Sequence, residues 1–174
     1  MNIENFQLNI ELFYLINHTR SSILDTFFGH FYLLGKGYIL IPILVFVVVF
    51  QRERLLLFLT SLTIETLSVQ LLKMYFNLPR PASMLTDVYL LEPLYHRSFP
   101  SGDTAMAFLL ASFFSPVAKV PLKILLWLYA LLIAYGRIYV GAHFPIDVLA
   151  GALIGIISYY VVCKINRRIS HVSF

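Results

Sequence analysis

Phosphate chemistry is suggested by three short polar segments that each adjoin an apolar run. They supply three cations, the start of a helix, and a histidine with an aspartate four residues on: Lys73 and Arg80; Ser101, Gly102 and Asp103; Arg137, His143 and Asp147. Ser101 follows Pro100 and can cap a helix that begins at about Gly102. Because such a start leaves backbone N–H groups unpaired at the positive end of the helix dipole, it predicts a phosphate site there.

The three cations fit the same ligand. Arg80 and Arg137 can each donate two parallel hydrogen bonds to phosphate oxygens, and Lys73 adds a point charge. Phosphoryl transfer needs such charges to balance the equatorial oxygens. The plainer alternatives are that Lys73 and Arg137 only snorkel from helix ends, and that Ser101 is only an N-cap.

His143 is the nucleophile that the spacing predicts. Asp147 lies one helical turn later on the same face, where it can accept the Nδ1 proton and leave Nε2 free to attack phosphorus. Water would then hydrolyse the phosphohistidine. No carboxylate and histidine cluster of metal-ligand type accompanies the pair, so we expect neither a metal nor another cofactor. The alternative is a histidine that only satisfies interfacial hydrogen bonds.

Composition places the chain in a membrane. Of its 174 residues, 59% are hydrophobic and 13% are charged, and the mean hydropathy is +0.80. A soluble domain carries about 25% charged residues. We therefore predict an all-α integral membrane protein with one domain over residues 1–174. The net charge of +4 indicates membrane orientation and a local anion site, not a nucleic-acid partner.

Apolar runs predict a bundle of six transmembrane helices, at residues 22–34, 38–50, 55–72, 102–117, 124–140 and 145–165. The first two runs are short for a bilayer that needs about 20 residues. They form either a hairpin of two short spans, which we prefer, or one long kinked span. Residues 1–20 alternate polar and apolar positions with a helical period, which predicts an amphipathic interfacial helix. The proline-rich residues 79–101 predict a loop with a short helix.

Basic residues set the orientation of this six-span arrangement. One side receives seven of them: Arg52, Arg54, Lys119, Lys123, Lys164, Arg167 and Arg168. The other side receives Lys36 and four that belong to or adjoin the three polar segments: Lys73, Arg80, Arg97 and Arg137. We therefore expect both termini in the cytoplasm and the polar segments on the outer, periplasmic face of a bacterial inner membrane.

The three segments together resemble the type-2 phosphatidic acid phosphatase superfamily. The matching patterns are Lys73 with six residues before Arg80-Pro81, then Pro100-Ser101-Gly102, then Arg137 with five residues before His143 and three more before Asp147. The resemblance implies a membrane lipid phosphatase with a phosphorylated lipid substrate and no obligate protein partner. Substrates within it include undecaprenyl diphosphate, phosphatidylglycerophosphate and lipid A 1-phosphate.

Two positions depart from the pattern of that superfamily. Gly136 stands where a serine is usual, and Asp103 stands where a histidine usually donates a proton to the leaving oxygen. Three explanations of Asp103 stay open. It is an engineered replacement, it suits a diphosphate whose leaving group needs little protonation, or it caps the helix while His96 or water supplies the proton.

The function classes that remain are a lipid phosphatase or diphosphatase, a phosphotransferase that passes the phosphate to another lipid, and a catalytically impaired lipid-binding form. Four further ionisable residues have no assigned role. Asp25 and Glu65 fall within apolar spans, where a polar partner or one of the cations is expected. His96 and Arg97 either touch a substrate headgroup or belong to a solvated loop.

Overall fold

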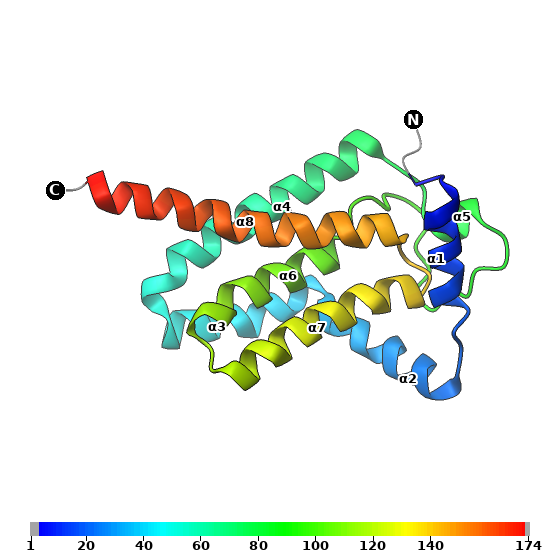
Figure 1. The fold of residues 1–174 in the computed structure, drawn as a ribbon, viewed down its shortest axis with the longest axis horizontal. Coiled ribbons are helices and arrows are strands. Elements are labelled where there is room, and N and C mark those ends of the chain that lie inside the picture. Colours follow the sequence, from blue (N-terminus) through cyan, green and yellow to red (C-terminus); the bar gives the residue numbers. More distant parts are fainter. Residues whose placement is uncertain (1–3, 173–174) are drawn as a thin grey trace.

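The computed structural model describes residues 4–172, and every regular element in that range is helical. The central helix is α6 (Gly102–Phe114), continued by a 3-10 turn over Ser115–Val117. It packs against the long helices α4 (Leu55–Phe76), α7 (Val120–Tyr139) and α8 (Pro145–Val172), as Figure 1 shows. Ten of the thirteen residues of α6 are buried, because it is apolar on all sides and enclosed by its neighbours. The predicted all-α class is confirmed for the described residues.

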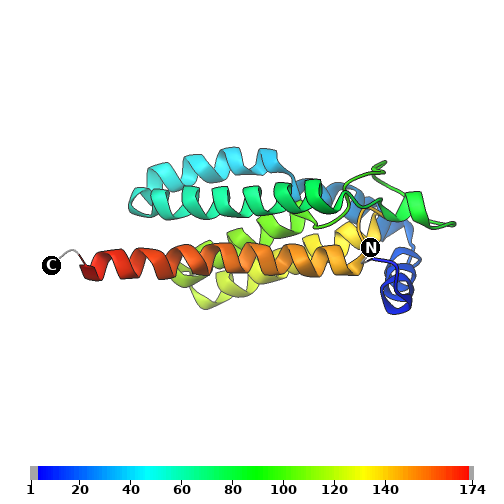
Figure 2. The ribbon, with the colours of Figure 1, turned by 90° about the horizontal axis from the view of Figure 1, so that it is seen from above.

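Residues 22–50 run in one direction along the bundle with a sharp bend. They comprise α2 (Ser22–Phe31), a 3-10 turn at Tyr32–Gly35, a second at Gly37–Ile39, and α3 (Leu40–Phe50). Lys36 between the turns is extended, and the two halves are bent by 58°. Figure 2 shows the halves following one another along the long axis. Because a bend of 58° does not reverse the chain, the two runs do not form the preferred hairpin. The bend fits the kinked alternative, whose crossing of a membrane stays a prediction.

The described residues contain three helical segments long and apolar enough to cross a membrane: Arg52–Phe76, Val120–Tyr139 and Pro145–Arg167. The bent segment makes a fourth candidate, and the apolar Gly102–Val117 is shorter. The chain is an integral membrane protein, but six spans are not found. Figure 1 shows α1 (Gln7–Asn17) and the end of α8 at opposite ends of the bundle. The expected placement of both termini on one side of the membrane requires six spans, which are not confirmed, and it stays a prediction.

Helix α1 packs on the end of the bundle where the polar segments meet. Its buried residues are Asn9, Phe13 and Asn17, whereas Leu8 and Leu15 are exposed. Asn17 donates to the carbonyls of Tyr89 and Tyr139 at 2.9 Å each. The predicted helix is present, but part of its polar side faces the protein; its position at a membrane interface stays a prediction. The 79–101 loop contains the expected short helix, α5 (Pro81–Met84).

Two glycines on α8 bring this helix against the backbone of α6. A Cβ at Gly151 would lie 2.4 Å from the carbonyl oxygen of Ser101, and one at Gly155 would lie 2.1 Å from that of Ala105. Real Cβ atoms do not approach so closely, so this small-xxx-small pair sets the spacing of the two helices. The backbone N–H of Ser101 also donates to the Asp147 carbonyl at 3.0 Å. The close packing therefore fixes the start of α6 relative to the start of α8.

We expect Gly155→Ala to destabilise the fold by about 1–3 kcal/mol, the usual cost of overpacking. The matched control is Gly29→Ala on α2, where a Cβ meets nothing within 4 Å. That change should leave stability unchanged or raise it by up to about 1 kcal/mol, because alanine is the better helix former. Thermal unfolding in one detergent measures both. Equal melting temperatures for the two variants would contradict the close packing of α6 on α8.

Candidate active site

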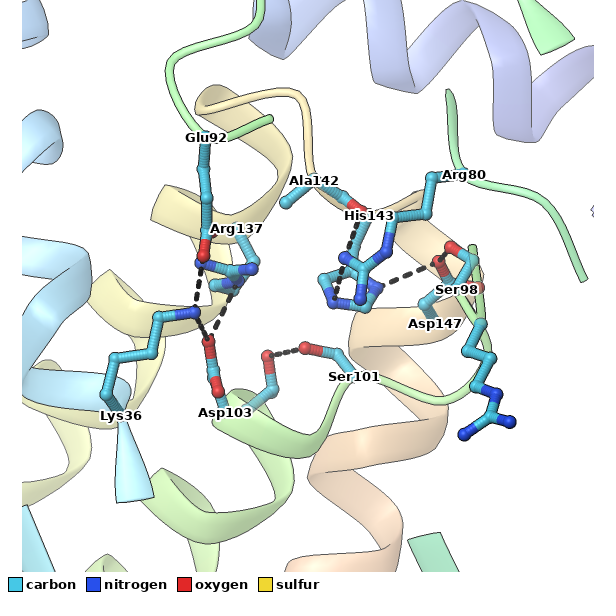
Figure 3. A network of polar contacts seen from close by, with 12 residues as sticks. Lys36, Arg80, Glu92, Ser98, Ser101, Asp103, Arg137, Ala142, His143 and Asp147 are labelled. Carbon is cyan, nitrogen blue, oxygen red and sulfur yellow. Dashed lines mark hydrogen bonds and ion pairs between the residues drawn. The ribbon is translucent and has the colours of Figure 1, made fainter. Parts of the chain in front are cut away.

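His143 lies in the turn between α7 and α8 and is bound through both ring nitrogens. Its Nδ1 is 3.2 Å from Asp147 Oδ2, and its Nε2 is 3.1 Å from Arg80 Nη1. Arg80 is held by the carbonyl oxygens of His96 and Ala142, each at 2.8 Å. Figure 3 shows the arginine lying against the imidazole ring. Since a guanidinium only donates, Nε2 is the acceptor and the ring proton is on Nδ1.

The surroundings keep this imidazole neutral. Burial lowers the pKa of His143 well below its usual range, and the positive charges of Arg80, Arg137, Lys73 and Lys36 act in the same direction. Its exposed fraction is only 2%. A neutral imidazole with a lone pair on Nε2 is the form that can act as a nucleophile.

Asp147 is fixed by several donors. Its Oδ2 accepts hydrogen bonds from the Ser98 hydroxyl and, at 2.9 Å, from the backbone N–H of Phe144. The charge of Asp147 also acts on the carboxyl group of Glu4. Glu4 is fully buried, and its carbonyl accepts from Asn9 Nδ2 at 2.7 Å. The segment before α1 therefore lies within electrostatic reach of the aspartate that orients His143.

Two buried carboxyl groups that interact electrostatically do not both ionise readily, because each negative charge disfavours the other. The pKa of Glu4 is raised to about 9, mainly by burial; the charge of Asp147 acts in the same direction, and the charges of Arg80 and Lys73 oppose it. Glu4 is therefore the protonated partner at neutral pH. No spacing in the sequence indicated this interaction, since Glu4 and Asp147 are far apart in the chain.

Glu4→Gln should raise the melting temperature by a few degrees at pH 8 and by less at pH 5. In the unfolded chain a glutamate loses its proton near ~4.3, whereas folded Glu4 keeps it to about pH 9. The folded state therefore loses stability as the pH rises through this window, and glutamine removes that loss. The control is Glu11→Gln on the exposed side of α1. A Glu4→Gln effect that does not change with pH would contradict the assignment of the proton.

A second cluster joins two cations and two carboxylates. Lys36 Nζ lies 2.6 Å from Glu92 Oε1 and 3.0 Å from Asp103 Oδ2. Arg137 contacts Glu92 through Nη1 and lies 3.3 Å from Asp103 Oδ2 through Nε. Although burial raises the pKa of Glu92, the charges of Arg137 and Lys36 outweigh burial and lower it overall. Figure 3 shows this cluster facing His143 and Arg80 across the start of α6.

The start of α6 lies between the two clusters. Helix α6 begins at Gly102 as predicted, and Ser101 occupies the N-cap position. The Ser101 hydroxyl, however, pairs with the Thr104 hydroxyl at 2.9 Å and makes no hydrogen bond to a backbone N–H. The prediction of a side-chain cap is therefore wrong. Asp103 does not cap the helix either, because the cations Lys36 and Arg137 hold its carboxylate.

Lys73, at the end of α4, lies at the edge of the site. Its ammonium donates to the carbonyls of Arg97 at 2.6 Å and Ser98 at 3.3 Å. It contributes to the positive potential at His143 and also holds the loop that carries Ser98.

The other ionisable residues singled out from the sequence lie around the site. His96 and Arg97 accept hydrogen bonds from Arg80 and Lys73 through their backbone carbonyls, while their side chains are exposed. Asp25 pairs with Arg20 at 2.8 Å and accepts from the Tyr139 hydroxyl.

The structure thus gathers all eight residues singled out from the sequence around one helix start. It adds Lys36, Glu92, Ser98 and Glu4. The glycines on both sides of Lys36 marked a helix break in the sequence, which was the available signal that this lysine is special. Glu92 and Ser98 lie in an irregular loop, where no periodicity indicates which way a side chain points.

Comparisons with known proteins agree with this geometry. A sequence profile of the PAP2 superfamily matches residues 54–170. The chain is 31% identical over 155 residues to an undecaprenyl-diphosphatase of Sulfolobus acidocaldarius, covering 87% of this chain and 75% of that protein.

Two crystal structures are similar. Aquifex aeolicus LpxE superposes with a TM-score of 0.92 at 53% identity, covering 94% of this chain and 99% of that one. The first transmembrane PAP2 type phosphatidylglycerolphosphate phosphatase from Bacillus subtilis shares the fold, with a TM-score of 0.76 at 22% identity over 93% of this chain and 86% of that one. The profile match extends from before α4 into α8 and includes both arginines, His143 and Asp147 but not Lys36, and the chain belongs to the PAP2 superfamily.

Proposed function

We propose that this protein is a membrane lipid phosphatase that works through a phosphohistidine at His143. The observation that supports it most is the neutral imidazole whose Nδ1 is held by Asp147 and whose Nε2 adjoins Arg80. The Sulfolobus acidocaldarius relative is named an undecaprenyl-diphosphatase, which supports a lipid phosphate or diphosphate as the substrate class.

The phosphate group would lie between the two clusters, over the N–H groups at the start of α6. Arg80 and Arg137 would each bind its oxygens, with Lys73 adding charge from the edge. Nε2 of His143 attacks phosphorus, a P–N bond forms, and the P–O bond to the lipid breaks. Water then cleaves the P–N bond and releases inorganic phosphate. Asp147 keeps the Nδ1 proton in place throughout, supported by Ser98 and Glu4.

Lys36 and Asp103 would act on the leaving oxygen. In-line displacement places the leaving group opposite the nucleophile, and Figure 3 shows these two residues on the side of the site away from His143. A carboxylate held by two cations is a poor proton donor, so Asp103 orients Lys36 and Arg137. The Lys36 ammonium then stabilises the leaving oxygen and supplies its proton, where the superfamily pattern uses a histidine.

The site would face the outer side of the inner membrane. The α3–α4 turn, the α6–α7 turn and the end of α8 lie away from α1 (Figure 1), and they carry the seven basic residues counted above. By the positive-inside rule that end is cytoplasmic. If residues 22–50 cross the membrane once, the segment before α1 lies on the outer side with the site. The end of α8 then lies on the cytoplasmic side, together with the α3–α4 and α6–α7 turns.

The test is phosphate release by purified protein from undecaprenyl diphosphate, phosphatidylglycerophosphate and an acylated glucosamine 1-phosphate. We expect release from at least one lipid at an undiminished rate in EDTA, because the cations take the part of a metal ion. No release from any of the three would contradict the phosphatase. A loss in EDTA that is restored by a divalent metal would contradict metal independence alone.

A further inference from the structure

Helix α8, which carries Asp147 in its first turn, has an incomplete cap of its own. Asp147 Oδ2 accepts from the backbone N–H of Phe144, the residue before the helix, at 2.9 Å. That contact is one half of a capping box, in which the residue before the helix returns a side-chain hydrogen bond to an N–H of the first turn. A phenylalanine cannot return it, and Pro145 has no N–H. The N–H of Ile146 therefore needs an acceptor from another part of the chain.

Helix α1 supplies that acceptor. Asn9 Oδ1 accepts from the backbone N–H of Ile146 at 3.1 Å, and Asn9 Nδ2 donates to the carbonyl oxygen of Glu4 at 2.7 Å. Asn9 is only 1% exposed. One turn later, the Phe13 ring packs against that of Phe144, with 5.4 Å between the ring centroids. Helix α1 thus completes the cap of α8 with a polar contact and covers it with an apolar one.

The first turn of α8 sets the geometry of the nucleophile. Asp147 Oδ2 is 3.2 Å from His143 Nδ1, and His143 comes two residues before the helix. A shift of this turn would separate the carboxylate from the imidazole or rotate the imidazole away from phosphorus. The cations that would bind the phosphate, by contrast, come from other elements: Lys73, Arg80 and Arg137. Loss of the cap should therefore affect the attack on phosphorus more than the binding of the lipid.

We propose that Asn9 is a positioning residue for the reaction, which holds the start of α8 so that Asp147 aligns His143 with phosphorus. The proposal rests on the proposed phosphatase function. It adds a residue of α1, a helix that lies before the matched superfamily profile, which begins at residue 54. An amide suits this role because its oxygen accepts while its nitrogen donates, at two separate atoms.

The test measures single-turnover formation of phosphoenzyme with the labelled lipid that wild type hydrolyses fastest in the phosphate-release test. Asn9→Leu removes both hydrogen bonds at similar volume. It should lower the rate at saturating lipid by at least about tenfold and up to about 10²-fold, the effect of a misplacement of about 1 Å. The lipid concentration that gives half of that rate should stay near the wild-type value. Asn9→Asp keeps the acceptor for Ile146 and should recover most of the rate.

The matched control is Asn17→Leu, at a buried asparagine of the same helix whose amide bonds to Tyr89 and Tyr139 and not to α8. It should cost similar stability in thermal unfolding but leave the rate near that of wild type. If Asn9→Leu does not fold in detergent, Asn9→Ser takes its place, because its shorter side chain cannot span both contacts. Equal losses of rate at the two asparagines, or no recovery in Asn9→Asp, would overturn the positioning role.

Proton NMR gives a readout that needs no turnover. The Nδ1 proton of His143 should give a downfield signal because it is hydrogen-bonded to a carboxylate, and His143→Gln identifies the signal by removing it. Asn9→Leu should shift this signal, and Asn17→Leu should leave it in place. An unchanged signal in Asn9→Leu would also overturn the proposal. Absent turnover by wild type on every lipid would count against the phosphatase itself, and the NMR signal would then decide the role of Asn9.

Discussion

His143→Gln should lower phosphate release by at least about 10⁴-fold, in line with the loss of a nucleophile in other covalent enzymes. Glutamine can still donate to Asp147, but it has no lone pair at the Nε2 position with which to attack phosphorus. Arg80 and Arg137 remain, so lipid binding should persist. Single-turnover reactions with labelled lipid phosphate should trap acid-labile phosphoenzyme in wild type and none in the variant.

The matched control for that change is His30→Gln. The His30 ring is exposed on α2 and hydrogen-bonds to the Thr26 carbonyl of its own helix, so wild-type turnover is expected. If the His143 variant retained substantial turnover, or still formed phosphoenzyme, another residue would be the nucleophile. If it lost both activity and lipid binding, the role of His143 would be in shaping the site.

Local spacing predicted the site because its key contacts are set by local geometry. His143 and Asp147 are one turn apart, so a helix beginning at Pro145 is sufficient to align them. Ser101 and Gly102 follow a proline before an apolar run, and the helix start was expected there. The two arginines were themselves a signal of a site, because a guanidinium within an apolar chain is costly unless a partner or a ligand compensates its charge.

The contacts that the sequence did not predict are those between segments far apart in the chain. Glu4 meets Asp147, and Lys36 meets Asp103, only because α1 and the break at Gly35–Gly37 are folded against the helix starts. The hairpin prediction failed for a related reason. Two short apolar runs joined by Gly-Lys-Gly fit either a reversal or a bend, and their composition does not distinguish the two.

Two variants of Arg80 distinguish the effect of its positive charge from the effect of its forked geometry. Arg80→Ala and Arg80→Lys should each lower kcat/KM by at least about 10²-fold, the usual effect of losing one donor to the transition state. A lysine keeps the charge but cannot reach the His96 and Ala142 carbonyls and Nε2 together, so it should rescue poorly. The control is Arg52→Ala, at the exposed turn before α4, which should behave as wild type.

The pH dependence then distinguishes the two variants. The positive charge of Arg80 lowers the pKa of His143, so its removal in Arg80→Ala raises that pKa and more of the imidazole is protonated at mildly acidic pH. The acid limb of kcat/KM, which reports the free enzyme, should move to higher pH in Arg80→Ala and stay in place in Arg80→Lys. The second ionisation of a phosphate monoester, near pH ~6, is common to all variants and cancels from the comparison. Near-normal kinetics in Arg80→Lys would exclude the forked contact, and identical acid limbs in both variants would exclude the electrostatic effect on His143.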